Sequence, residues 1–162
     1  MEDVARRAGV GIGTVYRHFQ TKDALIDALL NERFSQMTES VRAALAIKDS
    51  WLAITEAFQC TARLQAQDRC LAGALAERKP LFTTNAPIMR ELHAVWAQLL
   101  DRGQRDGVIR EDISAADIPN LMCALASVVG RSQPSGWERY LGILLDGLHA
   151  DASRSVLVVP DR

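Results

Sequence analysis

Five polar side chains near the start of the chain have the types and the spacing needed to contact a nucleic acid. They fall within one short segment and are Thr14, Tyr16, Arg17, His18 and Lys22. Hydroxyl groups, a guanidinium, an imidazole and an ammonium group can bond to phosphate oxygens or to base edges. Val15 and Phe19 are four residues apart, so they share the inward face of one helix and leave the polar residues on the outward face. This pattern predicts a DNA-contacting surface, with a solvated helix face as the alternative.

The elements that would position these residues are two short helices joined by a glycine-rich turn. We expect the first helix over residues 2–8, the turn over residues 9–13 and the second helix over residues 14–19. Ala5 supplies a small side chain where the two helices cross, and Gly9 tolerates a positive φ where the chain leaves the first helix. This layout is typical of a helix-turn-helix, in which the second helix enters the major groove.

The next helix should begin directly after this pair. Thr21 is a favourable N-cap residue, and Lys22 follows in the first turn. A cation at this end is disfavoured by the helix dipole. A contact between Lys22 and a DNA phosphate would explain its position.

The charge balance limits how the chain can attract DNA. The formal net charge is -1, so there is no overall basic field of the kind that drives non-specific binding. Any attraction must be local, and the cations nearest the predicted turn are Arg6, Arg7 and Arg17. A specific binder that uses a few placed contacts and doubles them by dimerising fits this balance.

Residues 4–30 closely resemble the amino-terminal domain of the TetR (tetracycline repressor) family of bacterial transcriptional regulators. The likeness includes the sequence TVYRHF in the second helix and TKDAL at the start of the third. The resemblance implies that the five polar residues contact operator DNA, and it favours a repressor over an activator. It also implies that the rest of the chain is an all-helical domain that senses a small-molecule effector and dimerises.

Members of that family normally carry a further helix, roughly a dozen residues or more, before the one expected here from Glu2. We therefore expect the three-helix DNA-binding unit to be incomplete in this chain, with reduced apolar cover over Val4, Ala8 and Phe19. The alternative function that follows is a truncated, dimeric ligand-binding protein without effective DNA binding.

The remainder of the chain has helical periodicity and no sustained alternating strand pattern, so we predict an all-α fold. The expected helices cover residues 22–46, 51–67, 70–77, 114–130 and 137–149. A further helix should begin at residue 87 and end within residues 103–107, and an extended connector should follow over residues 108–113. Ser114 and Asp117 form an acidic variant of a capping box. The predicted domains are 1–46 for DNA binding, including the connecting helix, 47–150 for effector binding and dimerisation, and a tail over 151–162.

Two further sets of residues are candidates for the sensing and dimerising roles. Adaptable, aromatic or polar side chains that would line an effector pocket are Met37, Phe58, Met89, His93, Trp96 and Met122, with Cys60 as a second polar point. Apolar side chains that would form a four-helix dimer interface are Leu121, Leu125, Leu141, Leu145 and Leu148. Internal packing within one chain is the alternative for each of these residues.

Other function classes receive no support from the sequence. There is no nucleophile elbow, metal-ligand spacing or phosphate loop, and the three histidines are scattered among the expected helices. We therefore expect no catalytic residues, no metal and no cofactor. Cys60, Cys70 and Cys123 are better explained as buried, inert thiols than as a redox pair. With no signal peptide and no apolar run long enough to span a bilayer, we expect a cytoplasmic protein.

Overall fold

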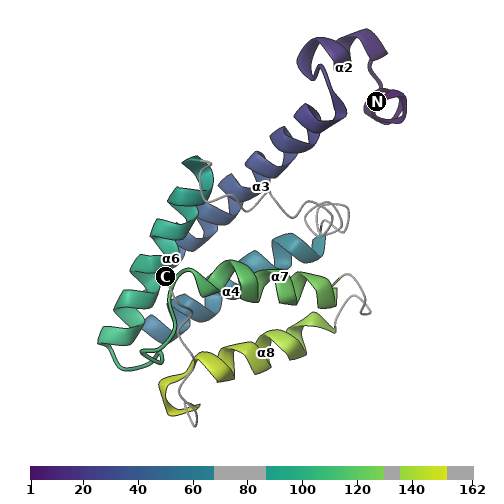
Figure 1. Cartoon of the computed structure of the whole chain (residues 1–162). Helices are drawn as coiled ribbons and strands as arrows, with labels where there is room; N and C mark the ends of the chain where they lie inside the picture. Colours follow the sequence, from purple (N-terminus) through teal and green to yellow (C-terminus); the bar gives the residue numbers. More distant parts are fainter. Residues whose placement is uncertain (68–86, 130–135, 153–162) are drawn as a thin grey trace. The chain divides into compact units, whose positions relative to one another are not determined.

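The computed structural model describes residues 1–67, 87–129 and 136–152. Within these ranges the chain is helical, which confirms the predicted all-α class (Figure 1). The helices are α1 (Glu2–Ala8), α2 (Ile12–His18), α3 (Lys22–Ala44), α4 (Ser50–Gln67), α6 (Pro87–Arg105), α7 (Asp117–Val129) and α8 (Trp137–Leu148), followed by a 3-10 turn over Ala150–Ala152. None of the described helices is both long enough and apolar enough to cross a membrane.

The chain divides into two compact units, Met1–Phe34 and Ser35–Arg162. The first unit contains α1, α2 and the beginning of α3, and α3 continues into the second unit. We predicted a domain boundary after residue 46, which places the whole of α3 in the DNA-binding domain, whereas the first compact unit ends at Phe34.

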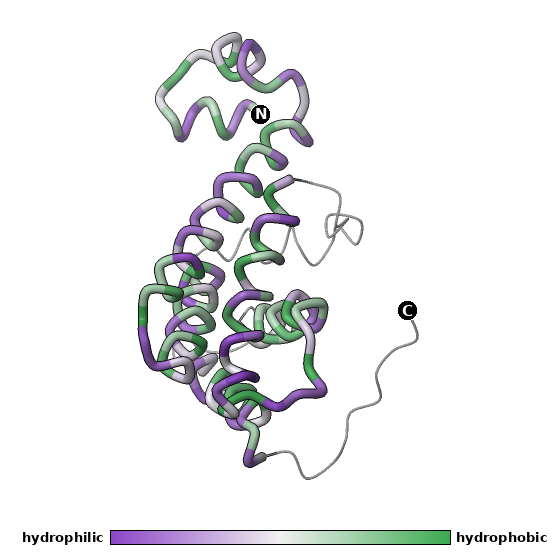
Figure 2. Tube along the Cα trace, turned by 90° about the vertical axis from the view of Figure 1, so that its left-hand side faces the viewer, coloured by the Kyte–Doolittle hydropathy of each residue, from purple (hydrophilic) through white to green (hydrophobic). Residues whose placement is uncertain are grey.

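In the second unit, α4 contacts α6, α7 and α8, so it is the central helix of the bundle (Figure 1). Hydrophobic and hydrophilic residues alternate along the helices of this unit (Figure 2), as amphipathic packing requires. The ring centroids of Phe58 and Trp96 lie 4.7 Å apart, which joins α4 to α6 in the core. The apolar residues that α4 buries recur at helical spacing and are Ala53, Ile54, Ala57, Phe58 and Ala62.

One glycine lets α6 approach α4 closely. A Cβ atom on Gly103 would lie 2.6 Å from Cδ1 of Ile54 and 2.7 Å from Cγ1 of Ile109. Carbon atoms in van der Waals contact are about 3.5–4.0 Å apart, so a side chain at this position would require Ile54 and Ile109 to shift. The sequence alone indicated only that the helix fades here.

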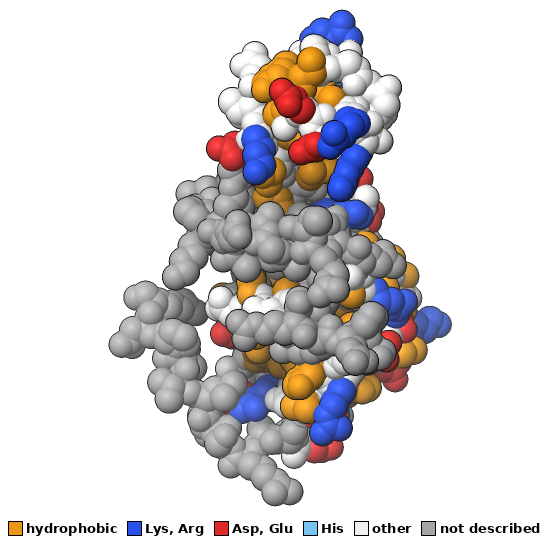
Figure 3. All heavy atoms as spheres, turned by 90° about the vertical axis from the view of Figure 1, so that its right-hand side faces the viewer, with side chains coloured by type: hydrophobic (Ala, Val, Ile, Leu, Met, Phe, Trp, Pro, Cys, Tyr) orange, Lys and Arg blue, Asp and Glu red, His pale blue; other side chains and the backbone are white. Residues whose placement is uncertain are grey.

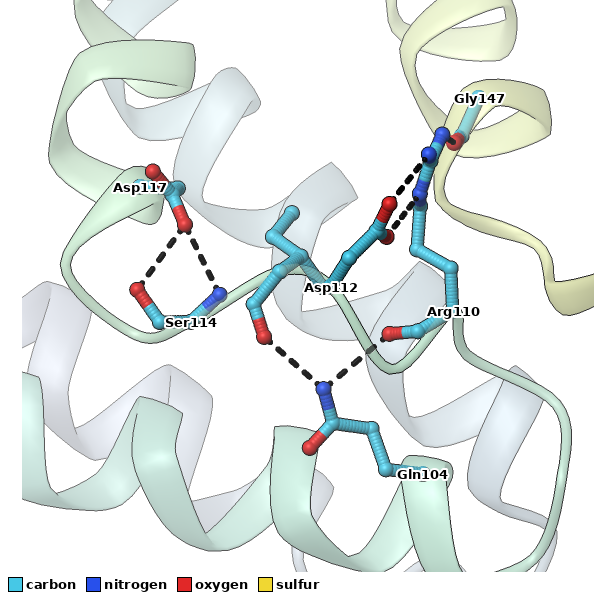
Figure 4. Close-up of polar contacts among 7 residues, drawn as sticks. Gln104, Arg110, Asp112, Ser114, Asp117 and Gly147 are labelled. Atoms are coloured by element: carbon cyan, nitrogen blue, oxygen red, sulfur yellow. Dashed lines mark hydrogen bonds and ion pairs between the residues drawn. The ribbon is translucent and has the colours of Figure 1, made fainter. Parts of the chain in front are cut away.

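Side-chain hydrogen bonds fix the segment that connects α6 to α7 (Figure 4). The Gln104 amide Nε2 donates to the carbonyl oxygens of Arg110, at 3.1 Å, and Ile113, at 2.9 Å. The guanidinium of Arg110 donates to the Asp112 carboxylate, at 2.9 Å for Nη2, and to the carbonyl oxygen of Gly147, at 3.2 Å. The pairing with Asp112 raises the pKa of Arg110.

The same connection pairs with the end of α8 through the backbone. The N–H of Arg110 donates to the carbonyl of Leu148, and the N–H of Ala150 donates to the carbonyl of Val108, both at 3.1 Å. The predicted extended connector over 108–113 is therefore correct around Ile109, which forms an isolated antiparallel bridge with His149.

Local capping sets where several helices begin. The Asp49 carboxylate accepts the N–H of Leu52 at 2.7 Å, so α4 begins at Ser50. The N–H and the hydroxyl of Ser114 donate to the Asp117 carboxylate, at 2.8 and 2.9 Å, which confirms their predicted pairing. The helix itself begins later than predicted, at Asp117. The predicted helix over 70–77, the loop that follows it and most of the tail lie outside the described residues.

Candidate nucleic-acid interface

The chain turns sharply after α1 because Gly9 adopts the left-handed conformation, with φ at 68°. The N–H of Val10 donates to the carbonyl of Ala5 at 3.0 Å and closes the end of the helix. Ala5 is buried, and α1 contacts α2. Both predicted features of the corner, a small residue at the crossing and a glycine at the exit, are confirmed.

The second helix, α2, begins at Ile12, two residues earlier than predicted. Gly11 is the N-cap residue, and its carbonyl accepts the N–H of Thr14 at 2.9 Å. Neither Gly11 nor Gly13 has a positive φ, so Gly13 does not extend the turn and the helix passes through it. The turn is therefore shorter than the sequence indicated, and Ile12 and Gly13 join the first turn of the candidate recognition helix.

The five candidate DNA contacts all lie on the first unit. Val15 is buried against the unit, which turns the polar side of α2 outward. Tyr16 is 49% exposed. Arg17, His18 and Lys22 are also exposed, whereas Thr14 is half-buried. No described residue of this set is enclosed by the core.

The start of α3 is fixed by the predicted cap. The hydroxyl oxygen of Thr21 accepts the N–H of Ala24 at 3.0 Å, which confirms Thr21 as the N-cap residue. Lys22 is then the first residue of α3 and projects from its amino-terminal turn.

Cations on this unit differ in whether a carboxylate neutralises them. Arg6 pairs with Asp3, and both side chains are exposed. Arg7, Arg17 and Lys22 make no ion pair with any residue in the described part of the chain. These three charges are accordingly available for phosphate groups. Figure 3 shows charged side chains around exposed hydrophobic ones on this part of the surface.

Two family models match the chain and together account for most of it. The model described as bacterial regulatory proteins, tetR family, matches residues 1–29, and so covers α1, α2 and the start of α3. The model described as transcriptional regulator SbtR-like, C-terminal domain, matches residues 50–150. The chain belongs to the TetR family. It is a transcriptional regulator with an amino-terminal helix-turn-helix, and regulators of this family bind DNA and usually dimerise.

Individual relatives of this TetR-family chain are also transcriptional regulators. The HTH-type transcriptional repressor KstR2 of Rhodococcus jostii (strain RHA1) is 28% identical over an alignment of 163 positions, which covers 91% of the chain and 80% of that protein. The HTH-type transcriptional regulator SAR0097 of Staphylococcus aureus (strain MRSA252) is 39% identical over 51 residues, or 32% of the chain and 27% of that protein. The crystal structure of the TetR transcriptional regulator SCO0520 from Streptomyces coelicolor is 27% identical, with a TM-score of 0.64, over 91% of the chain and 86% of that protein.

The candidate effector residues of this TetR-family chain separate into core and surface. Four of them are buried in the bundle: Met37, Phe58, Trp96 and Met122. Met89 and Cys60 are half-buried. His93 is exposed on α6, because Leu92, Val95 and Trp96 occupy the inward face of that helix. Its expected role in an effector pocket stays a prediction, because the side chain lies on the exposed face of α6.

A buried polar residue that the sequence analysis missed is Gln65, which is 7% exposed. Its Oε1 atom has no hydrogen-bond partner in the structure as described. Thr61, one turn earlier, is also buried, but its hydroxyl donates to the carbonyl of Ala57 at 2.8 Å. Thr61 and Gln65 follow Phe58 by three and seven residues, which places all three on one side of α4. This spacing could have indicated from the sequence that Gln65 faces the core.

The candidate dimer residues are mostly internal to one chain. Leu125, Leu141, Leu145 and Leu148 are buried, and Leu121 is half-buried. The reason is that α7 and α8 pack against each other and against α4, which covers their leucine stripes. These leucines therefore have little surface left for a second chain, and the interface expected from them stays a prediction.

The two described cysteines, Cys60 and Cys123, are free and half-buried. Burial raises the pKa of the Cys123 thiol, which favours the protonated form. No group of three or more potential metal ligands occurs among the residues that the structure describes.

Proposed function

We propose that this TetR-family regulator is a repressor that binds operator DNA through α2 and the first turn of α3. The contacting residues are Thr14, Tyr16, Arg17, His18 and Lys22. The observation that carries the proposal is the outward side of α2, where Tyr16 and Arg17 are exposed and no described carboxylate neutralises Arg17 or Lys22. Hydroxyl and cationic groups on such a helix can position it on phosphates and contact base edges.

The repressor acts as a homodimer in this proposal. Two recognition helices must lie about 34 Å apart, one turn of DNA, to contact both halves of a palindrome. The outer face of α8 is the better candidate interface, because Tyr140 and Ile143 are exposed there by 46% and 57%. These two residues are three positions apart and therefore lie on one side of the helix.

The effector site lies within the bundle in this proposal, beside the contact between Phe58 and Trp96. Met37 and Met122 supply adaptable apolar walls. The unpartnered Oε1 atom of Gln65 supplies a hydrogen-bond acceptor. We expect a mainly apolar effector that carries a hydroxyl or N–H group, since an unsatisfied buried acceptor is costly and a donor would relieve that cost.

Contacts between α3 and α6 provide a route from that site to the DNA-binding unit. Arg42 of α3 pairs with Glu91 of α6 as well as with Glu39. Arg102 of α6 donates to the carbonyl of Leu45, just beyond the end of α3, at 3.0 Å. An effector that displaces α6 would therefore displace α3, and so favour a dimer whose recognition helices no longer match the groove spacing.

The test is a fluorescence anisotropy titration with labelled duplexes from the DNA that flanks the gene for this chain. The chain is compared with a version extended upstream in its reading frame. Saturable binding to one fragment, weakened by unlabelled copies of that fragment and not by unrelated DNA, is the expected result. Absence of binding by both versions at low salt would contradict the proposal and favour a dimeric ligand-binding protein without effective DNA binding.

A further inference from the structure

The first residue of α2 is an isoleucine whose side chain is 40% exposed. It stands between two glycines. A Cβ atom on Gly13 would have no neighbour within 4 Å, and one on Gly11 would meet only the Thr14 hydroxyl at 4.0 Å. Ile12 is therefore a branched hydrocarbon that projects between two positions without side chains, at the amino-terminal end of the helix.

This end of the helix is the part that comes nearest to the bases. In helix-turn-helix proteins the amino-terminal residues of the recognition helix contact base edges in the major groove. Ile12 and Tyr16 are four residues apart and lie on one side of α2, and both are exposed. The two glycines remove the side chains that would hold the backbone away from the DNA, so Ile12 can reach the floor of the groove.

The chemistry of the groove restricts what an isoleucine can recognise there. Ile12 has no donor or acceptor for a phosphate or for the polar atoms of a base. The C5-methyl group of thymine is the apolar group that the major groove presents. We propose that Ile12 is a specificity-determining residue that packs against a thymine methyl group in each operator half-site. This inference rests on the proposed binding of operator DNA.

A competing role for Ile12 comes from its neighbours. Val4 of α1 and Val10 of the turn are exposed to a similar degree, by 40% and 42%. All three side chains would then belong to one apolar surface that packs against protein. Such a role predicts that Ile12 affects stability, and affects all DNA duplexes alike, whereas methyl recognition predicts a dependence on one base position.

The experiment removes single methyl groups from the DNA. The probe is the duplex that the chain protects in a footprint of its flanking DNA, with each thymine of the half-sites replaced in turn by deoxyuridine. Dissociation constants are measured for the unaltered protein, Ile12→Ala and Ile12→Val. Val10→Ala is the matched control, because it removes a similarly exposed side chain that lies outside α2.

We expect one thymine per half-site at which deoxyuridine weakens binding by the unaltered protein about fourfold, the value for burial of one methyl-sized group. Replacement in both half-sites of a palindrome should weaken it about fifteenfold. Ile12→Ala should bind the thymine and deoxyuridine duplexes equally, whereas Ile12→Val and Val10→Ala should retain the preference for thymine. The melting temperature of Ile12→Ala should equal that of the unaltered protein.

Two results would overturn the inference while leaving the proposed repressor intact. One is a deoxyuridine effect of the same size in Ile12→Ala and in the unaltered protein at every position. The other is a lower melting temperature for Ile12→Ala together with equally weakened binding to all duplexes, which assigns the residue to protein packing. If no flanking fragment is protected at all, the proposed function itself fails, and that outcome is recognised before any base is replaced.

Discussion

Replacing Gly103 with alanine should destabilise the helical bundle, although alanine is the better helix former. The new Cβ atom would lie 2.6 Å from Cδ1 of Ile54 and 2.7 Å from Cγ1 of Ile109. Ile54 and Ile109 are both fully buried, so neither side chain has free space to move into. The Cβ atom of Ile109, which does not move when that side chain rotates, is 3.4 Å away, at the short limit of ordinary contact.

Two opposing effects, helix propensity and overpacking, determine how much Gly103→Ala changes the free energy of unfolding. Alanine in a helix is favoured over glycine by at most about 1 kcal/mol, and Gly103 lies in the last turn of α6, where this gain is smaller. Overpacking a well-filled core costs about 1–3 kcal/mol, and two overlapping contacts place the cost near the upper end. We expect a net loss of about 1–2 kcal/mol in the free energy of unfolding. For a chain of this size that loss corresponds to a fall of roughly 2–8 °C in melting temperature.

The assay is thermal and urea unfolding followed by circular dichroism, at one protein concentration because melting of an oligomer depends on concentration. Gly142→Ala is the matched control, since a Cβ atom there would have no neighbour within 4 Å in the interior of α8. That variant should gain about 0.5–1 kcal/mol. Ile54→Val removes the closest overlapping atom, so Gly103→Ala should cost less in that background.

An increase in the stability of Gly103→Ala similar to that of Gly142→Ala would refute the reasoning. It would mean that α6 and α4 separate at no cost, and hence that the close approach at Gly103 does not determine their packing. An equal cost for Gly103→Ala with and without Ile54→Val would locate the overlap at Ile109 alone.

Three further predictions concern the dimer, the DNA surface and pH. Ile143→Glu should convert the proposed dimer to a monomer by light scattering without loss of helix content, because Ile143 is 57% exposed. Leu145→Glu should instead unfold the chain, because Leu145 is only 7% exposed and the new carboxylate would be buried. A folded monomer for Leu145→Glu would favour the leucine interface again. Tyr16→Ala should weaken operator binding about tenfold or more at unchanged melting temperature, and equal affinity by anisotropy would remove Tyr16 from the contact set. Because burial raises the pKa of the Cys123 thiol, the unfolded chain loses this proton first. The stability that Cys123 contributes is then present below about pH 8.5 and declines above it, so the difference in urea unfolding between Cys123→Ser and the unaltered protein should change over that range and not at neutral pH.

Signals that act over a few residues could be predicted from the sequence. Gly9 at the end of α1, Thr21 before α3 and the pairing of Ser114 with Asp117 are each determined by one turn of backbone. Helical periodicity was likewise enough for the all-α fold. The beginning of α2 was wrong by two residues because a glycine is compatible with both a turn and a helix, and only the backbone angles decide between them.

The orientation of broad apolar stripes could not be predicted. In α8 hydrophobic side chains cover more than half of the helix, so the pattern does not show whether Leu145 or Ile143 faces the core. The exposed position of His93 and the buried position of Gln65 have the same cause, since both depend on which neighbouring helix covers each face. The requirement for glycine at position 103 depends on Ile109, which lies beyond the end of α6.

The pairing of Arg110 with the end of α8 has a consequence for how this part of the chain opens. The hydrogen bonds from Arg110 to Leu148 and from Ala150 to Val108 close the chain between them into a loop that contains both α7 and α8. Because this closure joins the two ends of the segment, we expect α7 and α8 to open as one cooperative unit. In native-state hydrogen exchange, the amides of Arg110 and Ala150 should then exchange with the same free energy as the most protected amides of α7 and α8, although they lie outside both helices.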